Sequence, residues 1–415
     1  MLQQLVPPEL WRECIRWATL PSSGRLPLSA PPTCLTWFPG CMASRVFTEA
    51  PDFSYAYEQH QVYPTKRALM LVCKDWMEIA AEFLYESILV DLYDTGSAEK
   101  LEAVLRIPGR GSRLAWWVKS ADMNAKVKDH VPNIIQELCP NLRVLRMFTV
   151  DRINEPLLEL EGVPFLHPRS HLTTLSVTPT TLSTVLRVSP STLDYWRYLT
   201  IIVDDACTSV PILPQLLSLT IVPLYSNDTP SFAAIGSWSC PLLTHLSIHF
   251  WNESDDGFRL VEHFGPQLTF FALTILEPYI PLSTLDSCLK AMPNLKELVT
   301  PPLSNRVTPA EQGPLRGFRH ESIQVVGFPV HSISNNEVDS HSAAYAQTAR
   351  LLFPNLRAMR ITSAQRVYTA AHCRKNPFGD RLKYLTSLAH ILEEVGVVLE
   401  DPAGEDVRSF ILERG

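Results

Sequence analysis

A short apolar pattern, Leu-x-x-Leu-x-apolar, recurs along the second part of this chain and limits what the sequence can fold into. From Leu216 to Leu295 its copies follow one another after 27, 25 and 27 residues. A period in the twenties with this pattern is typical of leucine-rich repeats. The copies, often with a proline just upstream, are Leu142/Leu145/Met147, Leu172/Leu175/Val177, Leu216/Leu219/Ile221, Leu243/Leu246/Ile248, Leu268/Phe271/Leu273, Leu295/Leu298 and Leu356/Met359/Ile361, with a weaker one at Ile323/Val326/Phe328.

Each repeat offers one short strand and a return segment, and neither can bury its apolar side alone, so neighbouring units stack to complete a shared core. The pattern therefore predicts an α/β fold: an irregular leucine-rich-repeat solenoid of parallel strands with helical or loop returns over residues 93–415. Residues 196–203 are a candidate for a degenerate copy, and 382–394 and 396–400 predict a last helix and a closing strand. The alternative is a set of unrelated strands that happen to carry leucines.

The first 92 residues have a different character and predict a small helical segment. Pro7-Pro8-Glu9-Leu10 opens a helix, because proline suits a first turn and an acidic residue there complements the helix dipole. Residues 21–63 carry prolines and serines without a sustained period, and they predict a long loop insertion. Apolar residues then recur every three or four positions from Leu69 to Leu84, which predicts a second helix of about twenty residues. A short strand is expected at 87–92.

These two helical stretches resemble an F-box. Families of this type begin with Leu-Pro-x-Glu-Leu, and this chain has Val6-Pro7-Pro8-Glu9-Leu10, with valine in the first place. They also carry Leu-Val-Cys-Lys-x-Trp, which Leu71 to Trp76 matches at every defined position. The run from Leu84 to Ile88 resembles the Leu-Tyr-x-Ser-Ile ending of fungal, basidiomycete-type members. The insertion at 21–63 departs from the compact form of the motif.

The resemblance implies a substrate receptor of a cullin-based ubiquitin ligase. In such an assembly the F-box binds a Skp-type adaptor and through it a cullin, while the repeats hold a protein substrate. Exposed apolar residues on short helices mark partner sites, and a few anchors carry most of the binding energy. The alternative is that these residues pack against the first repeat. The residues expected to bind the adaptor are Pro7, Leu10, Ile15, Leu71, Val72 and Trp76.

Alternation along the strands predicts which side chains face the open inner surface of the repeats. Residues on either side of an inward leucine point to the opposite face of the strand. A mixed face of arginine, histidine and aromatic residues suits a protein partner. For His245 and His249 a metal pair is the weaker reading, because no cysteine or carboxylate lies at matching spacing. The candidates for substrate binding are Arg146, Phe148, His245, His249, Trp251 and Arg360.

Composition argues against several other classes of function. The net charge of −7 and the absence of a basic block argue against nucleic acid as a partner. No run approaches the roughly 18 apolar residues of a membrane span, and no phosphate-binding glycine motif occurs, so no membrane and no cofactor is expected. Nine scattered cysteines, an odd number without a C-x-x-C, fit a reducing compartment, the cytoplasm or the nucleus.

Two alternatives to the ligase reading remain open. Thr369 to Cys373 reproduces the sequence around the catalytic histidine of trypsin-like proteases, which suggests a hydrolase built on His372. Only 42 residues follow Cys373 and no Gly-Asp-Ser-Gly occurs, so we expect neither catalysis nor a metal site. The nearer alternative is a leucine-rich-repeat interaction scaffold that is not engaged with a ligase.

Overall fold

The structure is a computed structural model of the 415-residue chain. It describes residues 7–19, 64–90, 95–106, 111–124, 135–148, 174–177, 196–203, 211–223, 235–248, 255–273, 282–299, 319–328, 349–361, 379–400 and 406–408. The predicted insertion at 21–63 lies outside these residues. Contacts divide the chain into two compact units, whose described residues lie in 7–199 and in 200–408. No helix in the described ranges combines the length and the apolar character needed to cross a membrane.

The first unit begins with helices. Helix α1 (Pro8–Ala18) starts at the predicted prolines. A helix over residues 64–70 and helix α5 (Lys74–Tyr85) follow, with a turn at 71–73 between them. The prediction of one continuous helix of about twenty residues is therefore wrong. Cys73 is extended, with φ −161° and ψ 173°, and its Sγ accepts a hydrogen bond from the Trp76 amide at 3.5 Å, so it caps a new helix.

Parallel strands complete the first unit. Strand β1 (Ser87–Val90) confirms the predicted strand over the residues described, and β3 (Val144–Phe148) and β4 (Thr174–Val177) carry the first two copies of the repeat pattern. Between them lie α6 (Thr95–Arg106), α7 (Gly111–Trp117) and β2 (Ser120–Asn124), which the pattern does not mark. The strands pair in chain order. Strand β5 (Tyr198–Val203) confirms that the candidate degenerate copy forms a strand.

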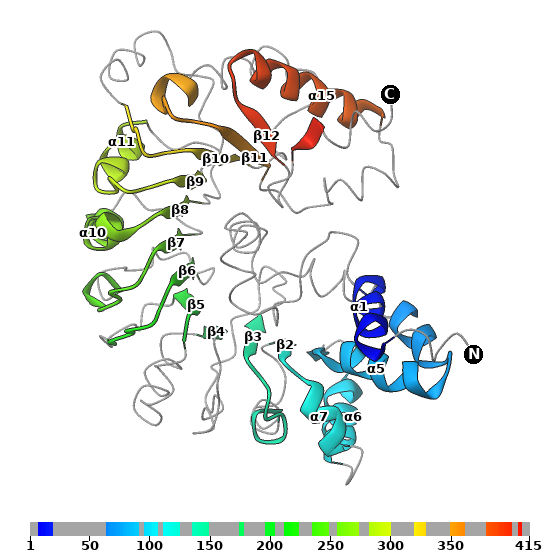
Figure 1. The fold of residues 1–415 in the computed structure, drawn as a ribbon. Coiled ribbons are helices and arrows are strands. Elements are labelled where there is room, and N and C mark those ends of the chain that lie inside the picture. Colours follow the sequence, from blue (N-terminus) through cyan, green and yellow to red (C-terminus); the bar gives the residue numbers. More distant parts are fainter. Residues whose placement is uncertain are drawn as a thin grey trace. The chain divides into compact units, whose positions relative to one another are not determined.

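The second unit is also a parallel sheet with helices. Its described strands pair in chain order, and α10 and α11 lie on the same side of β7 to β9 (Figure 1). The strands are β6 (Ser218–Pro223), β7 (His245–Ile248), β8 (Phe270–Leu273), β9 (Glu297–Val299), β10 (Val325–Phe328), β11 (Ala358–Ile361) and β12 (Val398–Glu400). The returns include η3 (Ile235–Ser237), α10 (Asp255–Phe264), η4 (Gly265–Gln267), α11 (Leu282–Lys290) and α15 (Gly379–Glu394). The α/β class with parallel strands is confirmed.

The repeated leucines form the core, as predicted. Burial of one such side chain contributes roughly 1.5–3 kcal/mol. Because the pattern places one inward residue in the strand and one just before it, every described copy adds a pair to the core. The first residue of each copy is at most 4% exposed: Leu142, Leu216, Leu243, Leu268, Leu295, Ile323 and Leu356. The second is at most 2% exposed: Leu145, Leu219, Leu246, Phe271, Leu298, Val326 and Met359.

A polar side chain directly before the first leucine links each of several copies to the preceding one. We call this place the carbonyl-binding position, because its side chain donates a hydrogen bond to a backbone carbonyl of the unit before. The bonds are Asn141 to Trp116 (2.7 Å), Gln267 to Cys240 (2.9 Å), Asn294 to Pro266 (2.8 Å), Ser322 to Pro293 (2.6 Å) and Asn355 to Glu321 (2.7 Å). The acceptors are return-segment carbonyls at the end of a unit, where the strands supply no partner.

Candidate docking surface and inner strand face

A small apolar core holds the helices of the first unit together. Ile15 of α1 is buried with Ala80 and Phe83 of α5, and Trp76 packs partly buried against them. The Trp76 ring lies 4.9 Å from that of Trp11, centroid to centroid, and this contact joins α5 to α1. Ile15, predicted to bind the adaptor, is only 2% exposed, so its role is corrected to that of a core residue.

Other predicted docking residues lie on the surface. Leu71 is 86% exposed and Val72 58% exposed, and both stand in the turn that separates the two helices. Leu10 on α1 is 56% exposed, and Pro7 before it is also exposed. Met77 of α5, which the sequence did not single out, is exposed as well. We refer to Leu10, Leu71, Val72 and Met77 as the exposed apolar set. Leu10 and Met77 belong to α1 and α5, and Leu71 and Val72 to the turn before α5.

Ion pairs fasten these helices to the first strands within the same unit. The Glu82 carboxylate of α5 is buried and pairs with Arg12 of α1. Lys119, just before β2, places its Nζ 3.0 Å from Glu86 Oε1 and 4.0 Å from Glu82 Oε1. The Lys119 and Ser120 amides both donate to the Glu86 carbonyl, at 2.9 and 3.0 Å. The exposed apolar set is therefore presented on a segment that charge and backbone hydrogen bonds tie to the sheet.

The face of the strands that was expected to be open is buried around His245. On β6, β7 and β8 its residues include Ser218, Ser247 and Phe270, all buried. The His245 ring stacks on that of Phe270 with centroids 5.3 Å apart, and its Nδ1 lies 2.8 Å from Thr244 Oγ1. Burial lowers the pKa of His245 to about 4, so the ring is neutral near pH 7. The prediction that His245 contacts a substrate on an open surface is corrected: its ring is part of a packed face.

Arg360 likewise serves inside the protein. Its side chain is 8% exposed, and its Nη2 lies 2.7 Å from Glu400 Oε2 and its Nη1 3.2 Å from Glu297 Oε2. Burial raises the pKa of Glu297, an effect that Arg360 opposes. Because this guanidinium is buried and paired with two carboxylates of the same chain, the prediction that Arg360 contacts a substrate on an open surface is corrected too.

The remaining predicted residues are not placed by the structure. Arg146 and Phe148 belong to strand β3, but their side chains lie outside the description. His249 and Trp251, and the protease-like His372, lie outside the described residues. Within the described ranges no group of three or more histidine, cysteine, aspartate or glutamate side chains could hold a metal ion.

Comparisons with known proteins do not assign a family. No family model matches the chain, and no curated protein matches it. Among solved structures, the chain is similar to a Bacteroides fragilis protein studied as a structural-genomics target, at 12% sequence identity. The match covers 74% of this chain and 78% of that one, with a TM-score of 0.35.

Proposed function

We propose that this chain is the substrate-recognition subunit of a cullin-based, SCF-type ubiquitin ligase. Residues 1–92 act as an F-box-like segment that docks a Skp-type adaptor. The units from residue 93 onward act as an irregular leucine-rich-repeat solenoid that binds a protein substrate. The chain performs no bond chemistry itself; it holds a substrate near the machinery that transfers ubiquitin.

The observation that carries this proposal is the exposure of Leu71 and Val72. Both belong to the run from Leu71 to Trp76 that resembles the F-box, and both are solvent-exposed in the turn before α5. The core of the helical segment is built from other residues, so these two side chains are not needed to hold it together. Neighbouring apolar side chains that a fold leaves exposed are typical of a protein interaction site.

The second half of the proposal, substrate binding, rests on the repeats. His245 and Arg360 are engaged internally, so the remaining candidates from the alternation pattern are Arg146, Phe148, His249 and Trp251. Leucine-rich repeats present a long series of parallel strands, and such arrays commonly provide extended binding surfaces.

Co-purification with a Skp-type adaptor tests the proposal. The full chain is expected to retain the adaptor, and the double variant Leu71→Asp/Val72→Asp is expected to lose it while keeping its circular dichroism spectrum. Leu351→Asp is the control, because Leu351 of the second unit is 69% exposed, a value between those of Leu71 and Val72. Retention of the adaptor by the folded double variant would refute docking through these residues. A folded full chain that never captures the adaptor would favour the repeat scaffold that is not engaged with a ligase.

A further inference from the structure

The outer edge of strand β12 is occupied by a short segment that runs the opposite way. On one side β12 pairs in parallel with β11, with Arg360 opposite Glu400. On the other side a single antiparallel bridge joins Glu400 to Asp406. All the pairings described between β6 and β12 are parallel, so this bridge interrupts the pattern by which one strand follows the next.

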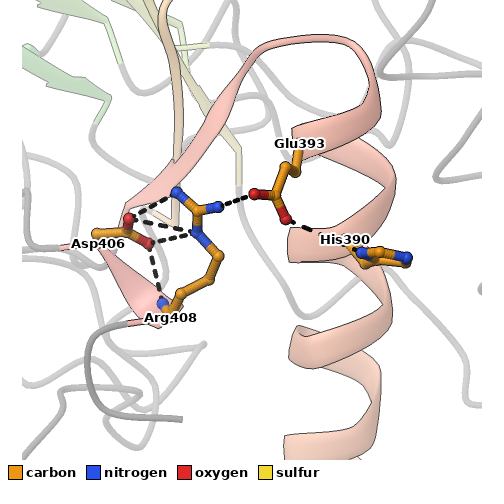
Figure 2. A network of polar contacts seen from close by, with 4 residues as sticks. All are labelled: His390, Glu393, Asp406 and Arg408. Carbon is orange, nitrogen blue, oxygen red and sulfur yellow. Dashed lines mark hydrogen bonds and ion pairs between the residues drawn. The ribbon is translucent and has the colours of Figure 1, made fainter. Parts of the chain in front are cut away.

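Residues 406–408 are fixed by both apolar and polar contacts. Val407 is fully buried, with 0% exposure. The Arg408 guanidinium reaches Asp406, with Nη2 3.0 Å from Oδ2, and Glu393 of α15, with Nη1 2.5 Å from Oε1 (Figure 2). The Arg408 amide also donates to Asp406 Oδ1 at 2.9 Å. A buried anchor, a backbone bridge and a two-carboxylate ion network thus act on three consecutive residues.

The Asp406–Arg408 ion pair is charged at neutral pH. Burial works to raise the pKa of Asp406, but the hydrogen bonds from Arg408 lower it below its usual value. His390 lies at the border of the network, with Nδ1 3.9 Å from Glu393 Oε2 and its side chain exposed (Figure 2). Replacing His390 therefore leaves the contacts of Arg408 intact.

We propose that Asp406–Arg408 is an edge cap that prevents β12 from pairing with β12 of a second copy of this chain. A free strand edge presents unpaired N–H and C=O groups to any other chain. Two copies of one edge are complementary in an antiparallel pair about a twofold axis, which makes a second copy the occupant we expect. Glu393 belongs to α15, the helix that precedes β12, so the ion pair ties the cap to the same repeat whose strand edge it covers. This inference does not depend on adaptor binding.

The test uses the full-length chain with Arg408→Glu, which places a third carboxylate beside Asp406 and Glu393 and releases the segment. Amide hydrogen exchange at residues 398–400 is expected to become about fivefold faster, the effect of losing a surface ion network. Sedimentation velocity is expected to show a dimer whose fraction grows with protein concentration. His390→Ala is the control and is expected to behave as the wild type. A folded Arg408→Glu variant that stays in the wild-type oligomeric state at every concentration overturns the proposal, whatever its exchange rate.

Because a glutamate is a drastic replacement, Arg408→Ala and Asp406→Ala provide milder versions of the same test. Each removes one side of the ion pair and leaves Val407 to anchor the segment. Both are expected to form the dimer at higher concentrations than Arg408→Glu does. Equal behaviour of these variants and the wild type, with the circular dichroism unchanged, also overturns the proposal.

Discussion

The Arg360 guanidinium on β11 reaches over strand β10 to the Glu297 carboxylate on β9, with Nη1 3.2 Å from Oε2. In the register of the sheet, the β10 residue opposite Arg360 is Gly327. Glu297 itself lies opposite Val325 of the same strand, two residues before Gly327. The same guanidinium bonds Glu400 on β12, so a single side chain connects three of the last four strands.

Removal of this cation is expected to destabilise the second unit. Arg360→Ala leaves two largely buried carboxylates without their shared partner, and the free energy of unfolding should fall by about 3–5 kcal/mol. Urea denaturation measures the change. The control is Lys290→Ala, which breaks the solvent-exposed Lys290–Asp286 pair and should cost less than about 1 kcal/mol. A loss for Arg360→Ala no larger than that of the control would contradict the account of this triad.

His245 is expected to make stability sensitive to acid. Its folded pKa of about 4 lies below the ordinary value of 6.5, so the folded chain binds fewer protons than the unfolded chain between these values. The contribution of His245 to the free energy of unfolding is fully present above pH 6.5 and is lost as the pH falls toward 4. The free energy of unfolding should fall by about 3 kcal/mol over this range. His245→Phe should keep the aromatic contact with Phe270 and flatten the pH dependence, measured by denaturation at several pH values.

The control for that experiment is His390→Gln, since His390 is exposed on α15. This variant should retain the wild-type slope between pH 4 and 6.5. Equal slopes for His245→Phe and the wild type would show that the packed face does not lower the pKa of His245.

Gly265 is expected to tolerate no side chain. A Cβ at this place would lie 2.3 Å from the Ala291 carbonyl oxygen, which belongs to the next repeat unit. Gly265→Ala should therefore push two units apart and lower the free energy of unfolding by about 1–3 kcal/mol. Gly236→Ala is matched to it, because a Cβ there meets nothing within 4 Å. Thermal denaturation measures both variants. Equal losses of stability for Gly265→Ala and Gly236→Ala would argue against the close approach of Gly265 to the Ala291 carbonyl.

Each side chain at a carbonyl-binding position is expected to contribute to the free energy of unfolding. Asn294→Ala removes the donor to the Pro266 carbonyl and should cost about 1 kcal/mol in urea denaturation. Leu242→Ala alters the same position in a unit where no donor stands, and it should cost less than about 0.5 kcal/mol. If the two changes cost the same, the hydrogen bond between units would have no measurable role.

The sequence predicts the strands that carry the repeat pattern because that pattern is local. One inward leucine in a strand and one before it follow directly from periodicity, and Leu219 and Leu246 are buried as expected. Strand β2 was not predicted, because Ser120 to Asn124 lacks the repeat pattern. This segment forms a strand by pairing with β1 and β3. The break at Cys73 was missed because an apolar stripe continues in register across a turn.

Interactions between distant residues explain the errors at the candidate site. Arg360 and Glu400 are 40 residues apart in the sequence. Alternation along β11 cannot show that β12 carries an ion-pair partner for Arg360. The same is true of Ile15, whose burial depends on Ala80 and Phe83. Leu71 and Val72, which the resemblance to an F-box marked as adaptor-binding residues, are exposed, and their role in adaptor binding stays a prediction.

The binding affinity between the full chain and a purified Skp-type adaptor, measured by isothermal titration calorimetry, tests the central claim most directly. The wild type should bind, and Leu71→Asp/Val72→Asp should weaken binding at least about thirtyfold, as the loss of a hot spot does. Leu351→Asp should change the affinity by less than about twofold. Equal affinities for the wild type and the folded double variant, or no binding by the folded wild type, would contradict the proposed role.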